Sequence, residues 1–308
     1  MLTIGNVTLD SNVILSPMAG FSDVALRVLS RRNGAGLVCT EMVNATAVNR
    51  DVARTQKLML VLDQERPTCI QIFGSKPEEV SASCKKVEAN CDIVGFNFGC
   101  PAYQIKAAGC GAALLDHPDT VEALVRTLRA STKKPLLIKM RLGNMGRADF
   151  VGVARRIEAA GADALIVHGR TAKDGYAGHA DWEAIRVIKQ AIRIPVIANG
   201  DVVDGPSAKK CLDVTGADGI AIGRAALGDP GVFQRINAYL KDGTVIPAPT
   251  PAQKIAMFNE YCAIANLVGI DKAQLVQQAM TFTKGIPGGA RLRERLASGA
   301  IEHVSITV

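Results

Sequence analysis

Cys100 has the setting in this chain that most favours chemistry. It follows the apolar segment Ile93–Phe98, which is typical of a buried strand, and it lies between Gly99 and Pro101 in a predicted loop. A thiol placed there could act as a nucleophile, ligate a metal or simply fill space. The residues that surround it in the folded chain must decide among these roles.

The other cysteines indicate neither a metal centre nor a redox pair. None of the eight belongs to a Cys-x-x-Cys motif, so a zinc knuckle and a redox dithiol are both disfavoured, and we predict no metal. Most of them lie inside apolar segments, where cysteine is usually a small buried hydrophobe. Cys110 differs, because it lies between Gly109 and Gly111.

A regular alternation of strands and helices must position Cys100. The segments with the pattern of buried parallel strands are Val13–Ala19, Gly36–Met42, Thr68–Phe73, Ile93–Phe98, Pro135–Arg141, Ala164–His168, Pro195–Asn199 and Gly219–Gly223. The clearest helical patterns between them are Ser22–Arg32, Pro77–Ala89, Pro118–Ser131, Arg147–Ala160, Trp182–Ala191 and Gly205–Leu212. This α/β pattern predicts a closed (β/α)₈ TIM barrel, with an open doubly wound sheet as the alternative.

Composition and repetition support the barrel. Hydrophobic residues make up 48% of the 308 residues but aromatic residues only 4%, which predicts the aliphatic core of a parallel sheet covered by helices. The segments Gly161–Val167 and Gly216–Ile222 repeat one phrase, in which a helix ends at glycine and a buried strand follows. No apolar stretch has the length of a membrane span and no signal-peptide pattern opens the chain, so we expect a cytoplasmic protein.

The chain changes character after the predicted barrel. We assign residues 1–243 to the barrel, residues 244–250 to a Pro-rich linker and residues 251–308 to a small all-helical domain. The helical patterns of that domain are Ala252–Leu267, Lys272–Thr283 and Ala290–Ala297. A unit of this size buries little surface alone, so we expect it to pack on the barrel.

Polar residues end most of the predicted strands. In a parallel barrel these ends gather on one rim, where active sites lie. Polar groups that converge there would be unsatisfied if they were buried without a ligand, so we predict a functional rim. The strand-end residues are Gln71, Asn97, Lys139, His168 and Asn199.

The loops after the last two strands predict an anionic ligand. Asn199-Gly200-Asp201 and Gly223-Arg224 lie where barrels often bind phosphate through backbone N–H groups. Flavin mononucleotide (FMN) fits better than a nicotinamide dinucleotide, because no Gly-x-Gly-x-x-Gly follows the first strand. Pro17-Met18-Ala19 would let the backbone run beside a flat ligand, and Lys139 would stabilise the negative charge of a reduced flavin.

These motifs together resemble one known family, the tRNA-dihydrouridine synthases, flavin enzymes that reduce uridine in RNA. The resemblance covers most of the predicted barrel. The motifs that carry it, in chain order, are Pro17-Met18-Ala19-Gly20 with Asp23 and Arg27, Gln71-Ile72-Phe73-Gly74, Asn97–Pro101 with Lys106 and Gly109–Leu115, Lys139-Met140-Arg141, His168–Thr171, Asn199-Gly200-Asp201 and Gly219–Ala225.

The resemblance implies an activity and a site. The activity is reduction of the C5–C6 double bond of specific tRNA uridines to 5,6-dihydrouridine, with NADPH or NADH as the electron donor. Cys100 would donate a proton to C5 opposite the hydride delivered to C6, so it must work as a thiol, and Asn97 would bind the imide edge of the base. The expected FMN contacts are Pro17, Met18, Ala19, Gln71, Lys139, His168, Asn199, Gly200, Asp201, Gly223 and Arg224.

An RNA substrate agrees with the charge of the chain. The formal net charge is +7, and a stacked uridine must leave the RNA fold before a flavin can reach it. We expect the C-terminal helices to form part of a tRNA clamp, and the RNA backbone to be held by Lys106, Arg141, Arg170 and Lys173. The alternatives are a dihydroorotate dehydrogenase-like flavoprotein acting on a free pyrimidine, and an RNA-binding factor whose flavin is structural.

Overall fold

The computed structural model describes residues 1–297, whose parallel strands close into an eight-stranded barrel. β11 (Gly219–Ile222) pairs with β3 (Val13–Leu15), so the last barrel strand joins the first. The predicted TIM barrel is confirmed and the open-sheet alternative is wrong, because an open sheet would leave these two strands unpaired. The strands between them are β4 (Val38–Cys39), β6 (Thr68–Phe73), β7 (Ile93–Phe98), β8 (Leu136–Arg141), β9 (Ala164–His168) and β10 (Val196–Asn199).

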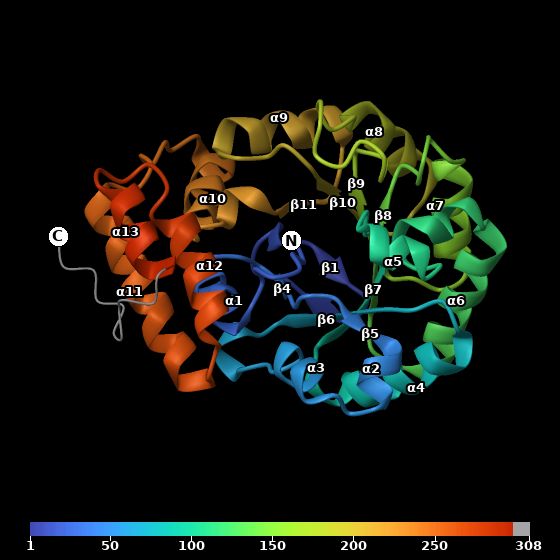
Figure 1. Cartoon of the computed structure of the whole chain (residues 1–308). Helices are drawn as coiled ribbons and strands as arrows, with labels where there is room; N and C mark the ends of the chain where they lie inside the picture. The colour runs from blue at the N-terminus through green and yellow to red at the C-terminus, as the bar shows by residue number, and fades with distance from the viewer. Residues whose placement is uncertain (298–308) are drawn as a thin grey trace.

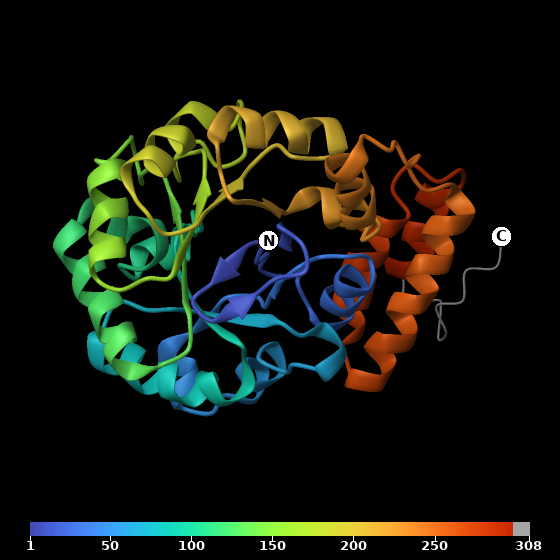
Figure 2. The same ribbon diagram turned by 180° about the vertical axis from the view of Figure 1, so that it is seen from behind.

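Helices surround the barrel, and a hairpin covers one of its ends (Figures 1 and 2). The hairpin pairs β1 (Thr3–Ile4) with β2 (Val7–Thr8). The helix α10 (Val232–Asp242) lacks a counterpart among the predicted helices, although its buried Val232, Phe233 and Ile236 have helical spacing. The outer helices are α1 (Val24–Arg32), α4 (Pro77–Val87), α6 (Pro118–Ser131), α7 (Phe150–Ala159), α8 (Trp182–Ala191), α9 (Gly205–Thr215) and α10 (Val232–Asp242).

The segment between β4 and β6 departs from the repeating pattern. The predicted strand Gly36–Met42 is a strand only at Val38–Cys39, and the chain then pairs again with β6 through β5 (Val43–Asn44). Three short helical pieces follow: α2 (Ala45–Asn49), α3 (Ala53–Leu58) and η1 (Asp63–Glu65). The other short turns are η2 (Glu88–Asn90), α5 (Tyr103–Ala107), η3 (Gly111–Asp116) and η4 (Arg224–Ala226).

The repeated phrase in the sequence fixes neighbouring strands in register. Asp163 lies just before β9, and its carboxylate accepts a hydrogen bond from the Leu136 N–H at the start of β8, at 2.7 Å. Asp218 lies before β11 and accepts from the Val196 N–H of β10, at 2.8 Å. Each aspartate therefore satisfies an N–H group that begins the preceding strand.

The C-terminal helices pack against the outside of the barrel at α1. Residues 243–250 form neither helix nor strand, and they lead to α11 (Pro251–Val268), α12 (Lys272–Phe282) and α13 (Gly289–Ala297). Phe258, Tyr261 and Phe282 form a buried apolar cluster with α1. Residues 298–308 of the predicted helical domain lie outside the described residues. Among the described helices, none combines the length and apolarity needed to cross a membrane.

Candidate active site

Asn97 holds the loop that carries Cys100. Its Oδ1 accepts hydrogen bonds from the N–H groups of Gly99 and Cys100, both at 2.8 Å, and its Nδ2 donates to Gln71 Oε1 on β6 at 2.8 Å. The Asn97 carbonyl is thus occupied by the loop, and one amide N–H of the same side chain remains. The predicted bond from Asn97 to a base must use that N–H.

Gly111, which follows Cys110, allows a second segment to approach Cys100. Gly111 has a φ of +61°, and a Cβ built on it would lie 3.0 Å from both Cβ and O of Cys100. The N–H of Ala112 donates to the Cys100 carbonyl at 3.1 Å. Cys110 itself is buried, and its Sγ lies 3.5 Å from the Ala108 carbonyl, so the two thiols have different surroundings.

Cys100 is half-buried, and its surroundings keep it a thiol. Burial raises the pKa of Cys100 above its ordinary value, and this outweighs the lowering effects of the Ala102 N–H and of the charges on Lys139 and Arg141. An activated nucleophilic cysteine has the opposite shift. The site therefore favours an acid over a nucleophile.

The strand ends next to Cys100 carry two buried basic side chains, Lys139 and His168. Burial, followed by the charge of Arg141, lowers the pKa of Lys139 to about 8. Burial and the cations Lys139, Arg141, Arg170 and Arg224 lower the pKa of His168 to about 2, so its imidazole is neutral. Within residues 1–297, the Lys139 ammonium has no hydrogen-bond or ion-pair partner. A buried ammonium left unpaired beside other cations indicates a site for an anion.

Arg141 and Arg170 are buried, and their guanidinium groups join loops of the rim by hydrogen bonds. Arg141 is 2% exposed and donates to the carbonyl oxygens of Gly99 and Thr171, at 2.9 and 2.8 Å. Arg170 is 3% exposed and donates to both carboxylate oxygens of Asp201, at 2.9 and 2.8 Å. These contacts fit the two guanidinium groups as braces between loops better than as the predicted contacts to an RNA backbone.

The loops after β10 and β11 present backbone donors. Gly200 has a φ of +121° and Asp201 one of +59°, which turns the chain back over the strand ends. In the part of the chain that the structure describes, the N–H groups of Gly200, Asp201, Gly223 and Arg224 donate to no protein acceptor. Four free N–H groups beside a cationic side chain form a setting that suits phosphate.

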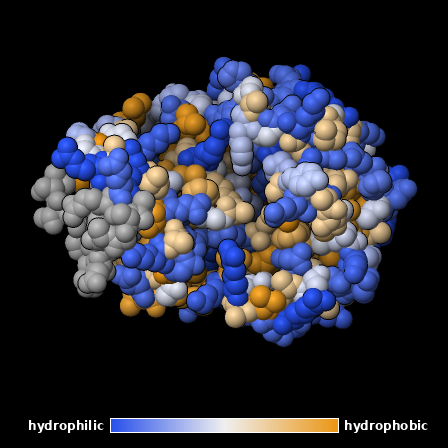
Figure 3. Space-filling model, viewed as in Figure 1, coloured by the Kyte–Doolittle hydropathy of each residue, from blue (hydrophilic) through white to orange (hydrophobic). Residues whose placement is uncertain are grey.

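Arg224 and the loop after β3 complete this side of the rim. The Arg224 guanidinium is exposed and lies 4.8 Å from the centre of the Tyr176 ring. Met18 reaches across from the loop after β3, because a Cβ built on Gly223 would lie 3.7 Å from its Sδ. Pro17 and Met18 are half-buried and Ala19 is exposed, and the Met18 N–H donates to Ser22 Oγ at 3.0 Å. Figure 3 shows the face of Figure 1, which is hollowed towards its middle.

Lys106 and Lys173 lie together at another part of the mouth. The Lys106 ammonium donates to Asn144 Oδ1 at 3.2 Å, and the Lys173 N–H donates to the Asn144 carbonyl at 2.9 Å. Lys106 is half-buried and the Lys173 side chain is exposed. Unlike Arg141 and Arg170, these two cations are free to face a large ligand.

Comparison with known proteins identifies the family of the chain. The model of the family described as dihydrouridine synthase (Dus) matches residues 14–304. The chain belongs to the dihydrouridine synthase family. The predicted resemblance, including its oxidoreductase class, is confirmed at this level.

Two curated relatives and one structure illustrate the match to the dihydrouridine synthases. A probable tRNA-dihydrouridine synthase 1 of Synechocystis sp. is 37% identical over 303 residues, which cover 96% of this chain and 84% of the relative. A tRNA-dihydrouridine synthase B of Pseudomonas aeruginosa is 40% identical over 255 residues, covering 82% of this chain and 76% of the relative. A 2-naphthoyl-CoA reductase complex has a TM-score of 0.62 at 12% identity, covering 84% of this chain and 57% of that one, and shows the fold alone.

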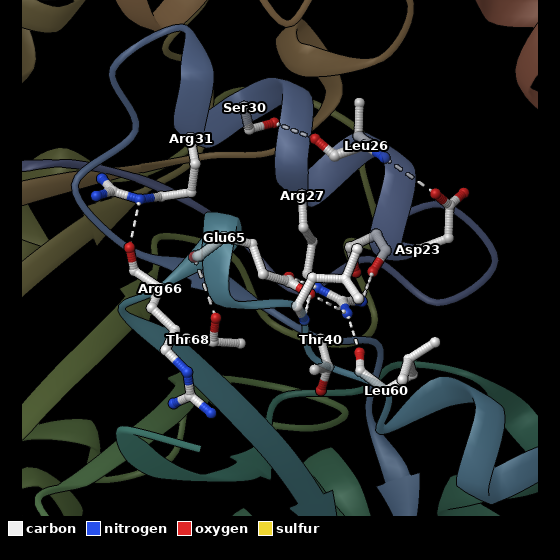
Figure 4. A network of polar contacts seen from close by, with 12 residues as sticks. Asp23, Leu26, Arg27, Ser30, Arg31, Thr40, Leu60, Glu65, Arg66 and Thr68 are labelled. Atoms are coloured by element: carbon white, nitrogen blue, oxygen red, sulfur yellow. Dashed lines mark hydrogen bonds and ion pairs between the residues drawn. The ribbon is translucent and has the colours of Figure 1, made fainter. Parts of the chain in front are cut away.

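Two motif residues, Asp23 and Arg27, lie away from the rim. Figure 4 shows Arg27 pointing from α1 towards Glu65 and the Leu60 carbonyl. The Arg27–Glu65 pair is 2.5 Å apart and buried, and Arg27 also donates to the Ser22 carbonyl at 2.7 Å. The motif spacing could identify these residues, but their partners lie on elements that local patterns do not connect.

Proposed function

We propose that the chain reduces the C5–C6 double bond of specific uridines in tRNA to 5,6-dihydrouridine, with FMN as its cofactor. The single observation that carries the proposal is Cys100, a half-buried thiol with a raised pKa that Asn97 fixes on a rim where the buried Lys139 ammonium has no partner within residues 1–297. Membership in the dihydrouridine synthase family supports the same reaction.

The residues on the rim fit FMN. The free N–H groups of Gly200, Asp201, Gly223 and Arg224, with the exposed Arg224 guanidinium, suit its phosphate. The unpaired Lys139 ammonium suits the negative charge of the reduced ring system, and Pro17, Met18, Ala19, Gln71, His168 and Asn199 line the rest. Bound FMN, once reduced by NADPH or NADH, supplies a hydride to C6 of the uracil.

Cys100 supplies the proton. As the C6–H bond forms, electron density moves to C5, and the Cys100 thiol transfers its proton there. The thiolate that remains is stabilised by the nearby charges of Lys139 and Arg141, and it takes a proton back from solvent. The remaining N–H of Asn97 and the amide of Gln71 are placed to orient the base, because the Asn97 carbonyl already holds the loop.

The RNA backbone meets Lys106 and Lys173 at the mouth, and residues 251–308 form an RNA-recognition domain in this cytoplasmic enzyme. Both lysines are better placed for phosphates than the braced Arg141 and Arg170. Neutralising Lys106 and Lys173 together is expected to weaken tRNA binding and to flatten its dependence on salt concentration. Filter binding at several salt concentrations measures this, and an unchanged slope would remove the two residues from the RNA contact.

The test of the reaction compares Cys100→Ala with Cys110→Ala. Loss of a positioned acid is expected to lower the rate of dihydrouridine formation about 10²- to 10⁴-fold, while the purified protein keeps its flavin colour. Mass spectrometry of tRNA treated with each variant measures the product. Cys110→Ala is the control, because its thiol is buried against the Ala108 carbonyl and has no part in the proposed step, so the rate should stay near that of the wild type.

The same variant separates the alternatives. If flavin is only structural in an RNA-binding factor, Cys100→Ala behaves like the wild type, which contradicts the proposal. Turnover of free dihydroorotate by the wild type, without product in tRNA, would instead support the small-pyrimidine alternative.

A further inference from the structure

A cavity lies between the barrel and the C-terminal helices. Its volume is about 230 Å³, the room of roughly eight water molecules at about 30 Å³ each. It lies between the loops after β3 and β4, helix α3 and the turn that joins α11 to α12. Gly20, which lines it, directly follows the Pro17–Ala19 segment of the proposed flavin site.

The inner wall of this cavity is fixed by hydrogen bonds. The Asp23 carboxylate accepts from Tyr261 Oη at 2.9 Å, from Gln278 Nε2 at 2.9 Å and from the Leu26 N–H at 3.0 Å. Arg27 beside it is held by Glu65 and by backbone carbonyls (Figure 4). Most bonding positions of both charged groups are taken by protein, so these groups shape the wall and offer little to a ligand.

Glu41 is different, because its carboxylate has capacity left. It is 7% exposed and lines the cavity. One oxygen accepts from the Gly20 N–H at 2.5 Å and the other from Gln274 Nε2 at 3.2 Å. A carboxylate has about four acceptor positions, so one remains on each oxygen. The side chain can therefore accept two parallel hydrogen bonds from a ligand.

The outer wall offers cations and apolar surface. Arg54 and Lys57 are three residues apart on α3, and both line the cavity with exposed side chains. Within the described part of the chain, neither has an ion-pair partner. The apolar lining residues are Leu58, Leu60, Val268 and Ile270, and Gln277 adds an exposed amide. Apolar walls, a bidentate acceptor and two cations at the mouth are a setting for a nucleotide.

We propose that this cavity binds a guanine nucleotide of the RNA substrate, a second base held beside the flavin loop. The inference rests on the proposed function and adds the base that the enzyme reads next to its target. Among the four bases, guanine alone presents two adjacent N–H donors, N1–H and N2–H, which match the two free positions on Glu41. In adenine, cytosine and uracil an acceptor adjoins the donor and would face the carboxylate. Arg54 and Lys57 contact the phosphates, and the Gln277 amide donates to guanine O6.

Binding of short labelled RNAs to the FMN-loaded enzyme tests the assignment. The probes are a hexauridine, the same chain with one guanosine, and the same chain with one inosine, which lacks only the N2 amino group. The guanosine probe is expected to bind about tenfold more tightly than hexauridine, and the inosine probe to fall between them. Equal binding of all three would overturn the proposal.

Variants of the cavity identify the group that reads the base. Glu41→Gln has nearly the same shape but presents an amide N–H where guanine needs an acceptor, so it should abolish the guanosine preference. Arg54→Gln with Lys57→Gln should weaken all three probes and flatten the salt dependence while the preference stays. The control is Glu78→Gln, an exposed carboxylate on α4 outside the cavity, which should change nothing. A preference that survives Glu41→Gln would exclude this site.

Two further outcomes distinguish this proposal from the proposed reaction and from a binding site for the reductant. Cys100→Ala should keep the guanosine preference, so a failure of the proposed reaction leaves the binding result readable. If Glu41→Gln raises the KM for NADPH and spares RNA binding, the cavity holds the reductant and the RNA assignment is wrong.

Discussion

The barrel rim and the cavity beside the C-terminal helices bury charges of opposite sign. On the rim the buried groups are bases, and burial lowers the pKa of Lys139 to about 8 and that of His168 to about 2. In the cavity two of the buried charged groups, Asp23 and Glu41, are acids, and burial raises the pKa of both. One physical cause, loss of water around a charge, thus acts on both sites with opposite effects on protonation.

The difference indicates what each site accepts. The rim has an unpaired ammonium and free N–H groups, so it gains most from an anion. The cavity has the Glu41 carboxylate, which has acceptor positions left, so it gains most from N–H donors. In both places a bound ligand would supply the hydrogen bonds that the buried groups lost when folding removed water. A ligand that binds only the native state stabilises that state.

Breaking the Arg27–Glu65 pair beside the cavity should have the largest effect on the free energy of unfolding. Arg27→Met leaves Glu65 buried without its cation, and breaking such a pair costs about 3–5 kcal/mol in the free energy of unfolding. Urea denaturation measures this. The matched control, Arg27→Met with Glu65→Leu, removes both charges and should recover most of the loss. A single variant as stable as the wild type would show that the wall of the cavity does not depend on this pair.

The barrel rim could be predicted from the sequence because short segments of the chain determine its strands and the residues that end them. β6, β7 and β9 have the predicted bounds, and the polar residues that end them converge as expected. The parallel register forces this, since strands that begin at one end of a barrel finish together at the other. The pattern of Val232, Phe233 and Ile236 would also have placed α10, which was missed although its spacing is as regular as that of the other helices.

The cavity side could not be predicted in this way. Tyr261 is 238 residues from Asp23, and Gln274 is 233 residues from Glu41, so no local pattern connects them. The surroundings of Arg141 and Arg170 could not be predicted for a related reason. Their positions at strand ends were predictable, but whether a guanidinium faces solvent or a neighbouring carbonyl depends on how the loops pack.

On the rim, the prediction concerns Lys139 and the effect of pH on flavin binding. Because its pKa is lowered to about 8, the ammonium is charged at neutral pH and loses its proton as pH rises through about 8. Affinity for reduced FMN, whose ring carries the negative charge, should therefore fall across that range. Lys139→Met is expected to bind reduced FMN roughly tenfold more weakly at pH 7 and to lose this pH dependence. Anaerobic titration with reduced FMN at several pH values, followed by flavin absorbance, measures both, with Lys173→Met, an exposed lysine, as the control. A variant that keeps the wild-type profile would remove Lys139 from the anion site.

Tyr261→Phe should have the smallest effect on the free energy of unfolding, and it should leave the rim unchanged. The change removes the hydroxyl that donates to Asp23 at 2.9 Å but keeps the ring stacked on Phe258, with centroids 6.1 Å apart. Asp23 retains its bonds from Gln278 and Leu26, so the expected loss is about 1 kcal/mol in the free energy of unfolding. Urea denaturation measures it against Tyr239→Phe, a half-buried tyrosine outside the network. FMN affinity should not change, because the two sites share the barrel but not this bond. A variant that loses FMN affinity would instead show that the docking of the C-terminal helices reaches the flavin loop through Asp23.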